Sequence, residues 1–131
     1  MLTITQSCVQ AIAFRAVFVR PNKHNVTLHL EISRSVRVDA LNSGLTTYRT
    51  DFHTTCADAS YEFGSREIRY YHGPVAEAMW HACDHGNPEY AVRALFCDLQ
   101  QDAADGELPT LITRIVAEVW SLAESGNFEV I

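Results

Sequence analysis

Two histidines, His81 and His85, stand four residues apart in the segment His-Ala-Cys-Asp-His. On an α-helix this spacing puts both imidazoles on one face, where they can share a metal ion as the two histidines of an H-E-x-x-H motif do. Ala82 replaces the glutamate that acts as base in that motif, and Cys83 projects to the opposite side. Histidine is also favoured electrostatically near a helix C-terminus. A third ligand would have to come from folding, from His72, His53 or Cys56.

A second pair, His53 and Cys56, has the residue types of a base and a thiolate nucleophile. Residues three apart on a strand face opposite sides of the sheet, which separates the two groups. The sequence also lacks G-x-S-x-G, P-loop, G-x-G-x-x-G and zinc-deaminase patterns. We therefore predict no catalytic residues, metal or cofactor. A metal-dependent enzyme centred on His81 and His85 is the alternative hypothesis.

Carboxylates dominate the second half of the chain. Residues 1–73 contain eight Lys/Arg and six Asp/Glu, whereas residues 74–131 contain two Arg and ten Asp/Glu, within a total net charge of −6. An acidic segment cannot neutralise phosphates, so nucleic acid is not its expected partner. It can meet a basic protein surface, with charge complementarity steering the encounter. The candidate partner-binding residues are Glu77, Asp84, Asp98, Asp102, Glu118 and Glu124.

The first half interleaves cations with aromatic residues, which on a sheet can hold phosphates and stack single-stranded bases. Six carboxylates in the same region dilute its positive field, and pairing of Arg with Glu across strands explains most of the pattern. A single-stranded nucleic-acid binder is therefore a further alternative. The residues concerned are Arg15, Arg20, Lys23, Arg34, Arg37, Arg49, Arg66 and Arg69 with Tyr48, Tyr61, Tyr70 and Tyr71.

Three helices are expected to position the carboxylates. Pro74 suits a first helical position, and apolar residues at helical spacing predict a helix over 74–85 that Gly86 ends. Asn87 and Pro88 begin the next helix as N-cap and first residue, and it runs to Ala104 before Asp105–Gly106. A third helix, starting near Pro109 and closed by Gly126, carries an apolar stripe wide enough for burial on more than one side.

The residues before Pro74 predict strands. Alternation is clearest over 26–32, with a bend expected at 33–35 before the same parity resumes, and the Thr-rich segment 45–56 suits another strand. A strand is expected over 12–20, with a short helix that uses the capping-box pattern of Ser7 and Gln10 as the alternative. A marginal strand is expected at 1–5, and turns are expected at 21–25 and 42–44. A hairpin should join 61–63 to 66–70. Residues 128–131 should form a short strand or an apolar tail.

Strands followed by helices indicate an α+β fold: an antiparallel sheet of about four to five strands with three helices on one face. We expect one domain over 1–131, with 1–73 mainly β, 74–126 helical and 127–131 a tail.

Four scattered cysteines and no signal-like or spanning segment predict free thiols in a cytoplasmic protein. The predicted function is a non-enzymatic interaction module, an inhibitor that masks a basic, nucleic-acid-binding surface of a larger partner. Bacterial immunity proteins and phage anti-defence proteins such as anti-CRISPR proteins are classes consistent with this; a homodimer is left open.

Overall fold

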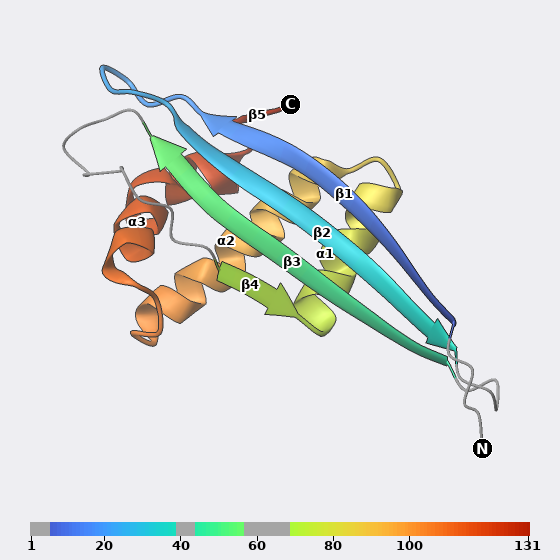
Figure 1. Cartoon of the computed structure of the whole chain (residues 1–131). Coiled ribbons are helices and arrows are strands. Elements are labelled where there is room, and N and C mark those ends of the chain that lie inside the picture. The colour runs from blue at the N-terminus through green and yellow to red at the C-terminus, as the bar shows by residue number, and fades with distance from the viewer. Residues whose placement is uncertain (1–5, 39–43, 57–68) are drawn as a thin grey trace.

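A computed structural model describes residues 6–38, 44–56 and 69–131 of the chain. It is an α+β fold in which a five-stranded antiparallel sheet, ordered β4-β3-β2-β1-β5, lies against three helices (Figure 1). Four strands precede the helices and the fifth follows them, which confirms the predicted class. The elements are β1 (Gln6–Phe18), β2 (Val26–Val38), β3 (Gly44–Cys56), β4 (Arg69–His72), α1 (Pro74–Asp84), α2 (Pro88–Ala104), α3 (Thr110–Ser125) and β5 (Glu129–Val130).

Residue alternation determines which face of the sheet is covered. The even-numbered residues from Ala16 to Phe18 of β1 and from Val26 to Ile32 of β2 are buried, because they face the helices. The β1–β2 and β2–β3 registers run unbroken over thirteen residues each, so the bend expected at 33–35 does not interrupt the pairing. The strands predicted over 26–32 and 45–56 are confirmed.

The first strand begins at Gln6, well before the predicted Ile12, and ends at Phe18. The helical alternative at Ser7–Gln10 is wrong, since these residues pair with 34–37 of β2. A capping box is a local signal, and long-range pairing with a regular neighbouring strand overrides it. The residues between β1 and β2 form the expected turn.

The helix boundaries follow the predicted caps. The side chain of Asn87 accepts a hydrogen bond of 3.2 Å from the backbone N–H of Tyr90, as an N-cap does. Gly86 and Gly126 follow α1 and α3 with φ angles of 79° and 75°, in the left-handed region that glycine adopts without strain. The first helix ends at Asp84, one residue short of the predicted His85, which is its C-cap.

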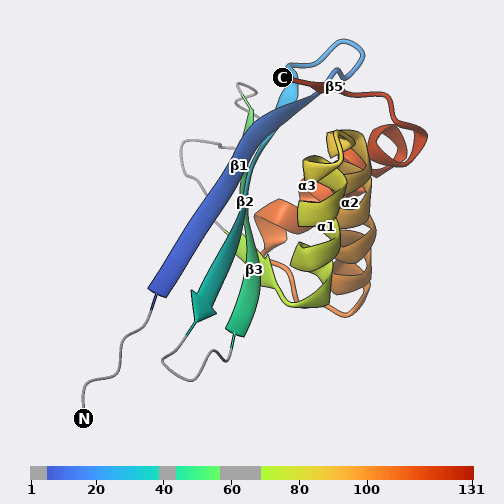
Figure 2. The same ribbon diagram turned by 90° about the vertical axis from the view of Figure 1, so that its right-hand side faces the viewer.

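All three helices cover the same face of the sheet (Figure 2), and the hydrophobic core fills the space between the two layers. Phe18 lies near its centre, with its ring centroid 5.2 Å from those of Phe96 and Phe128. The buried residues of α3 form one stripe, Ile112, Ile115, Val116, Val119 and Ala123. Trp120 and Leu122 flank this stripe, are partly buried and pack against the core, so the apolar face of α3 is wide, as predicted.

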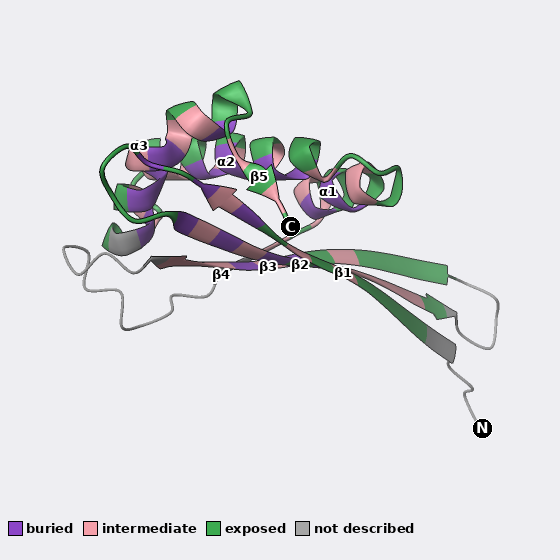
Figure 3. Cartoon of the chain, turned by 90° about the horizontal axis from the view of Figure 1, so that it is seen from above, coloured by how far each residue is buried: buried purple, intermediate pink, exposed green. Residues whose placement is uncertain are grey.

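One end of the long strands extends past the helices (Figure 3). There Cys8, Val9, Gln10 and Ala11 of β1 are all exposed, on both faces of the sheet. The short tail at the C-terminus forms β5, which pairs with Ala16 and Val17 of β1. The strand expected at 1–5, most of the turn at 42–44 and most of the hairpin at 61–70 lie outside the described residues. None of the helices described has the length and apolar character needed to cross a membrane.

Candidate functional site

Three of the six predicted partner-binding carboxylates are exposed on the helices. Glu77 and Asp84 lie on α1, and Glu124 lies near the end of α3. Glu77 has a neighbour of opposite polarity, since its Oε1 is 3.8 Å from Nε2 of His81. Both of these side chains are about half exposed, and an exposed pair at this distance contributes little to stability. These carboxylates are available to a partner.

Asp98 and Asp102 stand one turn apart on α2 and are partly buried. Burial raises the pKa of Asp98 above its usual value, and the charge of Asp102 raises it further. Asp102 accepts a hydrogen bond from the hydroxyl of Tyr71, which ties α2 to the β4 edge of the sheet. Like charges at this spacing repel each other, and the Tyr71 hydroxyl bonds to only one of the two carboxylates, so the pair remains a concentration of negative charge on the helix.

Glu118 has a different environment from the other five. Its Oε1 accepts hydrogen bonds from Nη1 of Arg20 and, at 3.2 Å, from Nζ of Lys23. Arg20 is buried, and its Nε donates to the backbone oxygen of His24 at 2.8 Å. This carboxylate is already neutralised inside the molecule and holds the β1–β2 turn against α3. The predicted binding role fits it less well than a structural one.

The histidines of α1 lie side by side on the helix, with ring centroids 6.5 Å apart. Nδ1 of His85 is 2.6 Å from the backbone oxygen of His81, while the ring of His81 is 5.7 Å from that of Tyr48. The side chains that the structure describes include no group of three or more His, Cys, Asp or Glu arranged to hold a metal ion. His53 and His72, two of the proposed third ligands, belong to β3 and β4.

Cysteine chemistry is disfavoured at Cys83. Burial, and secondarily the charge of Glu89, raises the pKa of this thiol to about 11, so it stays protonated near neutral pH. His53 stacks on His29 at a centroid distance of 4.5 Å and an interplanar angle of 2°. The side chain of Cys56, the proposed nucleophile beside His53, lies outside the described part of the structure.

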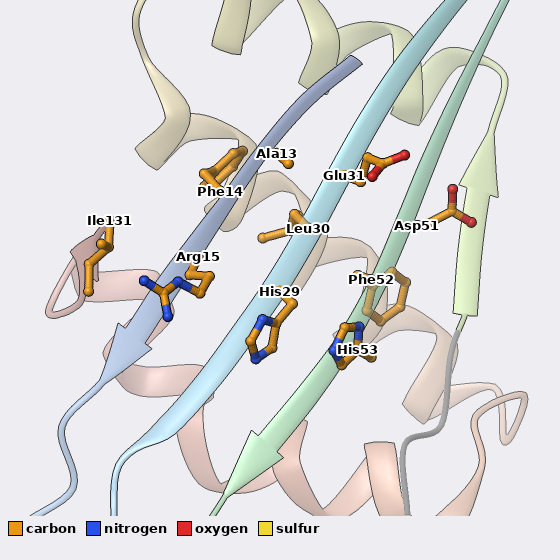
Figure 4. A pocket seen from close by; sticks show the side chains of 10 residues that line it. All are labelled: Ala13, Phe14, Arg15, His29, Leu30, Glu31, Asp51, Phe52, His53 and Ile131. Atoms are coloured by element: carbon orange, nitrogen blue, oxygen red, sulfur yellow. The ribbon is translucent and has the colours of Figure 1, made fainter.

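The face of the sheet that the helices leave open carries a shallow hollow of about 620 Å³ (Figure 4). A row of Arg15, His29 and His53 crosses β1, β2 and β3, and the next row places Glu31 beside Asp51. The hollow thus alternates bands of basic and acidic groups. The alternation predicted over 26–32 places His29 and Glu31 together on the outward face, but it does not reveal this cluster, because the cluster depends on the strand registers.

Arg49 and Asp51 add an ion pair to this open face, at 2.9 Å from Nη2 to Oδ1, and Nε of Arg49 donates to the same oxygen at 3.0 Å. The histidine row is also engaged, since Nε2 of His29 lies 2.9 Å from Oγ1 of Thr55. Several polar side chains of this surface are therefore already bonded to one another.

The cations and aromatic residues proposed for nucleic-acid stacking are divided between the two sides of the sheet. Tyr71 stacks on Phe52 on the helix side, and Tyr48 lies beside His81 of α1. Arg20 and Lys23 are engaged with Glu118. Single-stranded nucleic-acid binding by the sheet remains a prediction, but these two tyrosines are not on its open face.

A scan against protein-family models and searches of curated proteins and of solved structures found no significant match to this chain.

Proposed function

We propose that this chain is a non-enzymatic protein-interaction module that binds a basic surface of a larger protein through its helices. The observation that carries the proposal is the separation of charge between the two layers. Residues 74–131 contain ten carboxylates and two arginines, and the helices they form make up one side of the molecule (Figure 2). A surface of this sign attracts cationic partners and accelerates their encounter.

The acidic helical surface is defined here by the exposed carboxylates Glu77, Asp84, Glu89, Asp105 and Glu124 with the half-buried pair Asp98 and Asp102. Its apolar residues face the sheet, so partner binding need not disturb the core. Glu118 is left out, because its charge is balanced by Arg20 and Lys23.

The Asp98–Asp102 pair favours contact of this surface with a cationic group of a partner. Proximity of the two carboxylates and partial desolvation raise the free energy of the ionised pair, as the raised pKa of Asp98 indicates. A lysine or arginine of the partner placed beside them would relieve this repulsion on binding. Close contacts between opposite charges at the centre of an interface contribute to affinity, whereas charges at the rim mainly affect the association rate.

A basic surface on a larger protein is commonly one that binds nucleic acid, and a carboxylate-rich helical layer can occupy it in place of phosphates. The proposed activity is therefore inhibition by masking, the mode of action of immunity and phage anti-defence proteins.

The test begins by identifying a partner by affinity capture and then measures binding with both proteins purified. The triple variant Glu77→Lys, Asp84→Lys and Glu124→Lys is expected to lose binding at least tenfold while keeping its circular dichroism spectrum. The matched control reverses Glu31 and Glu129, exposed carboxylates outside the helices, and should bind as the wild type does. Wild-type affinity should fall as salt rises. Binding that survives the triple reversal and does not respond to salt contradicts the proposal.

The masking step has its own readout. The partner's affinity for nucleic acid should drop when the wild-type chain is added and recover with the triple variant. A ternary complex with unchanged nucleic-acid affinity would show binding without inhibition.

A further inference from the structure

The outer edge of β1 is the longest open strand edge in the described part of the sheet. β5 covers β1 only at Ala16 and Val17, and beyond it Arg15 and Ile131 exchange two backbone hydrogen bonds of 2.8 and 3.0 Å. From Phe14 back to Gln6, none of the described strands pairs with this side of β1. At about 3.4 Å per residue the open edge is roughly 30 Å long.

This edge lacks the features by which proteins keep strand edges from pairing. Gln6–Phe14 reads Gln-Ser-Cys-Val-Gln-Ala-Ile-Ala-Phe, with no charged residue and no proline. Its pairing with β2 is continuous, so no bulge bends it away from an incoming strand. The strand at the opposite side of the sheet, β4, is four residues long and begins with Arg69.

The backbone direction along this edge can be assigned. Both the N–H and the C=O of Arg15 point away from β2, since they bond to Ile131. Along a β-strand, the backbone N–H and C=O groups of every second residue point to the same side. The N–H and C=O groups of Ser7, Val9, Ala11 and Ala13 therefore also point away from β2. Open backbone donors and acceptors in such a row are a template for another strand.

We propose that a second copy of this chain adds its own β1 to this edge in antiparallel orientation and forms a two-fold dimer with one continuous sheet. A register with Gln10 opposite Gln10 of the second copy uses the whole open edge. Ser7 then faces Ala13 of the copy and Val9 faces Ala11, as pairs that exchange hydrogen bonds, about eight bonds in all. Such an interface is isologous, because each copy contributes the same residues.

The side chains along the edge are self-compatible. Gln6–Phe14 contains no charged residue, so in any antiparallel register within it no like charges oppose each other, an arrangement that would destabilise the pairing. Val9 is 66% exposed and would pack on Ala11 of the second copy. A foreign strand would find no charged group here to select it, which favours a copy of the same strand as the occupant.

The position of the edge leaves room for a second molecule. Cys8–Ala11 are exposed on both faces, and this part of β1 extends past the helices (Figure 3). The carboxylates of the acidic helical surface belong to other elements than the open edge of β1, so pairing along this edge does not use them.

Sedimentation velocity on the intact chain tests the proposal. The wild type is expected at twice the chain mass of 14.7 kDa. Ala11→Lys places a charge at the edge and should give the monomer mass. Thr47→Lys adds the same charge to the same face of the sheet on β3 and should leave the dimer intact. A wild type that sediments as a monomer at ~100 μM, or a dimer unaffected by Ala11→Lys, overturns the proposal.

Cysteine cross-linking tests the register and does not depend on the lysine variants folding. In a background that carries Cys8→Ser and Cys97→Ser, which removes both exposed cysteines described, Gln10→Cys places two cysteines directly opposite at a non-hydrogen-bonded pair, with Cα atoms about 4.5 Å apart, within disulfide range. Val9→Cys places the two cysteines on opposite sides of the two-fold axis. Their Cα atoms are then farther apart than the ~7 Å that a disulfide can bridge. Oxidation should give a covalent dimer for the first variant alone. A cross-link at position 9 and none at position 10 excludes this register and with it the proposed dimer.

Discussion

The guanidinium of Arg20 forms an ion pair with the carboxylate of Glu118, although the two residues are 98 positions apart in the sequence. Only 3% of the Arg20 side chain is exposed, so this ion pair lies largely out of contact with water on the Arg20 side. The pair fastens the turn after β1 to α3, and Lys23 reinforces it from the solvent side. Removing one member of a buried ion pair destabilises a protein strongly, because the remaining charge loses its counter-charge.

Glu118→Ala is expected to lower the free energy of unfolding by about 3 kcal/mol, because it removes the carboxylate that forms an ion pair with the buried Arg20 cation. Lys23→Ala should change it by about 0.5 kcal/mol or less, since the Lys23 side chain is 53% exposed. Urea denaturation measures both changes.

The double variant Arg20→Met and Glu118→Leu serves as a control, since it removes both charges and should be more stable than Glu118→Ala alone. Equal stability of Glu118→Ala and the wild type would show that the ion pair contributes nothing.

Tyr71→Phe should cost about 1.5 kcal/mol, because it removes the hydroxyl that donates to the Asp102 carboxylate. The ring itself stays in place through its stacking on Phe52, at a centroid distance of 5.7 Å. Tyr90→Phe is the matched control, since Tyr90 is 50% exposed on α2 and should tolerate the change. Thermal denaturation distinguishes the two variants, and an equal midpoint for Tyr71→Phe and Tyr90→Phe would contradict a stabilising bond.

Cys83 should be the slowest of the described thiols to react with iodoacetamide. A pKa raised from 9.0 to about 11 keeps the thiol protonated until strongly alkaline pH. At pH 8 this lowers its thiolate fraction roughly a hundredfold relative to an ordinary cysteine, beyond the effect of reduced access. Cys8 and Cys97 are exposed and provide the comparison in the same molecule. Peptide mapping gives each rate, and unfolding in urea should make the three similar; a native Cys83 that reacts as fast as Cys97 contradicts this.

The helical layer could be predicted from the sequence almost to the residue, because its boundaries depend on local signals. Pro74, Asn87–Pro88 and Gly126 are start and stop residues whose effect does not require the rest of the fold. The alternation in β2 is equally local and gave its inward face correctly.

Long-range pairing accounts for what the sequence did not predict. The N-terminal part of β1 contains a capping-box pattern, and only its partner β2 makes it a strand. The stacking of His29 on His53 depends on the β2–β3 register, and the Tyr71–Asp102 bond depends on how α2 lies over β4.

One signal for the Arg20–Glu118 pair was present in the sequence. Arg20 has the same parity as the inward-facing Ala16 and Phe18, which places a cation on the covered side of the sheet. A buried cation requires an acidic partner on the covering helices, though parity alone does not say which of their carboxylates it is.

Repulsion between Asp98 and Asp102 should affect both the stability of the protein and the proposed partner binding, and Asp98→Asn tests both effects. Because the folded-state pKa of Asp98 is raised, the folded chain binds more protons than the unfolded one, and this group favours folding less as pH rises through the carboxyl range. Asp98→Asn should therefore stabilise the protein at pH 7, by about 0.5 kcal/mol for a like-charge pair at this spacing. The gain should vanish as pH falls toward 3.8, the ordinary value for this group. Glu124→Gln, an exposed change on α3, should lack that pH dependence.

If the acidic helical surface binds a basic partner, the same Asp98→Asn variant should bind it more weakly while unfolding less easily. A variant that is more stable and binds equally well would place the partner site elsewhere.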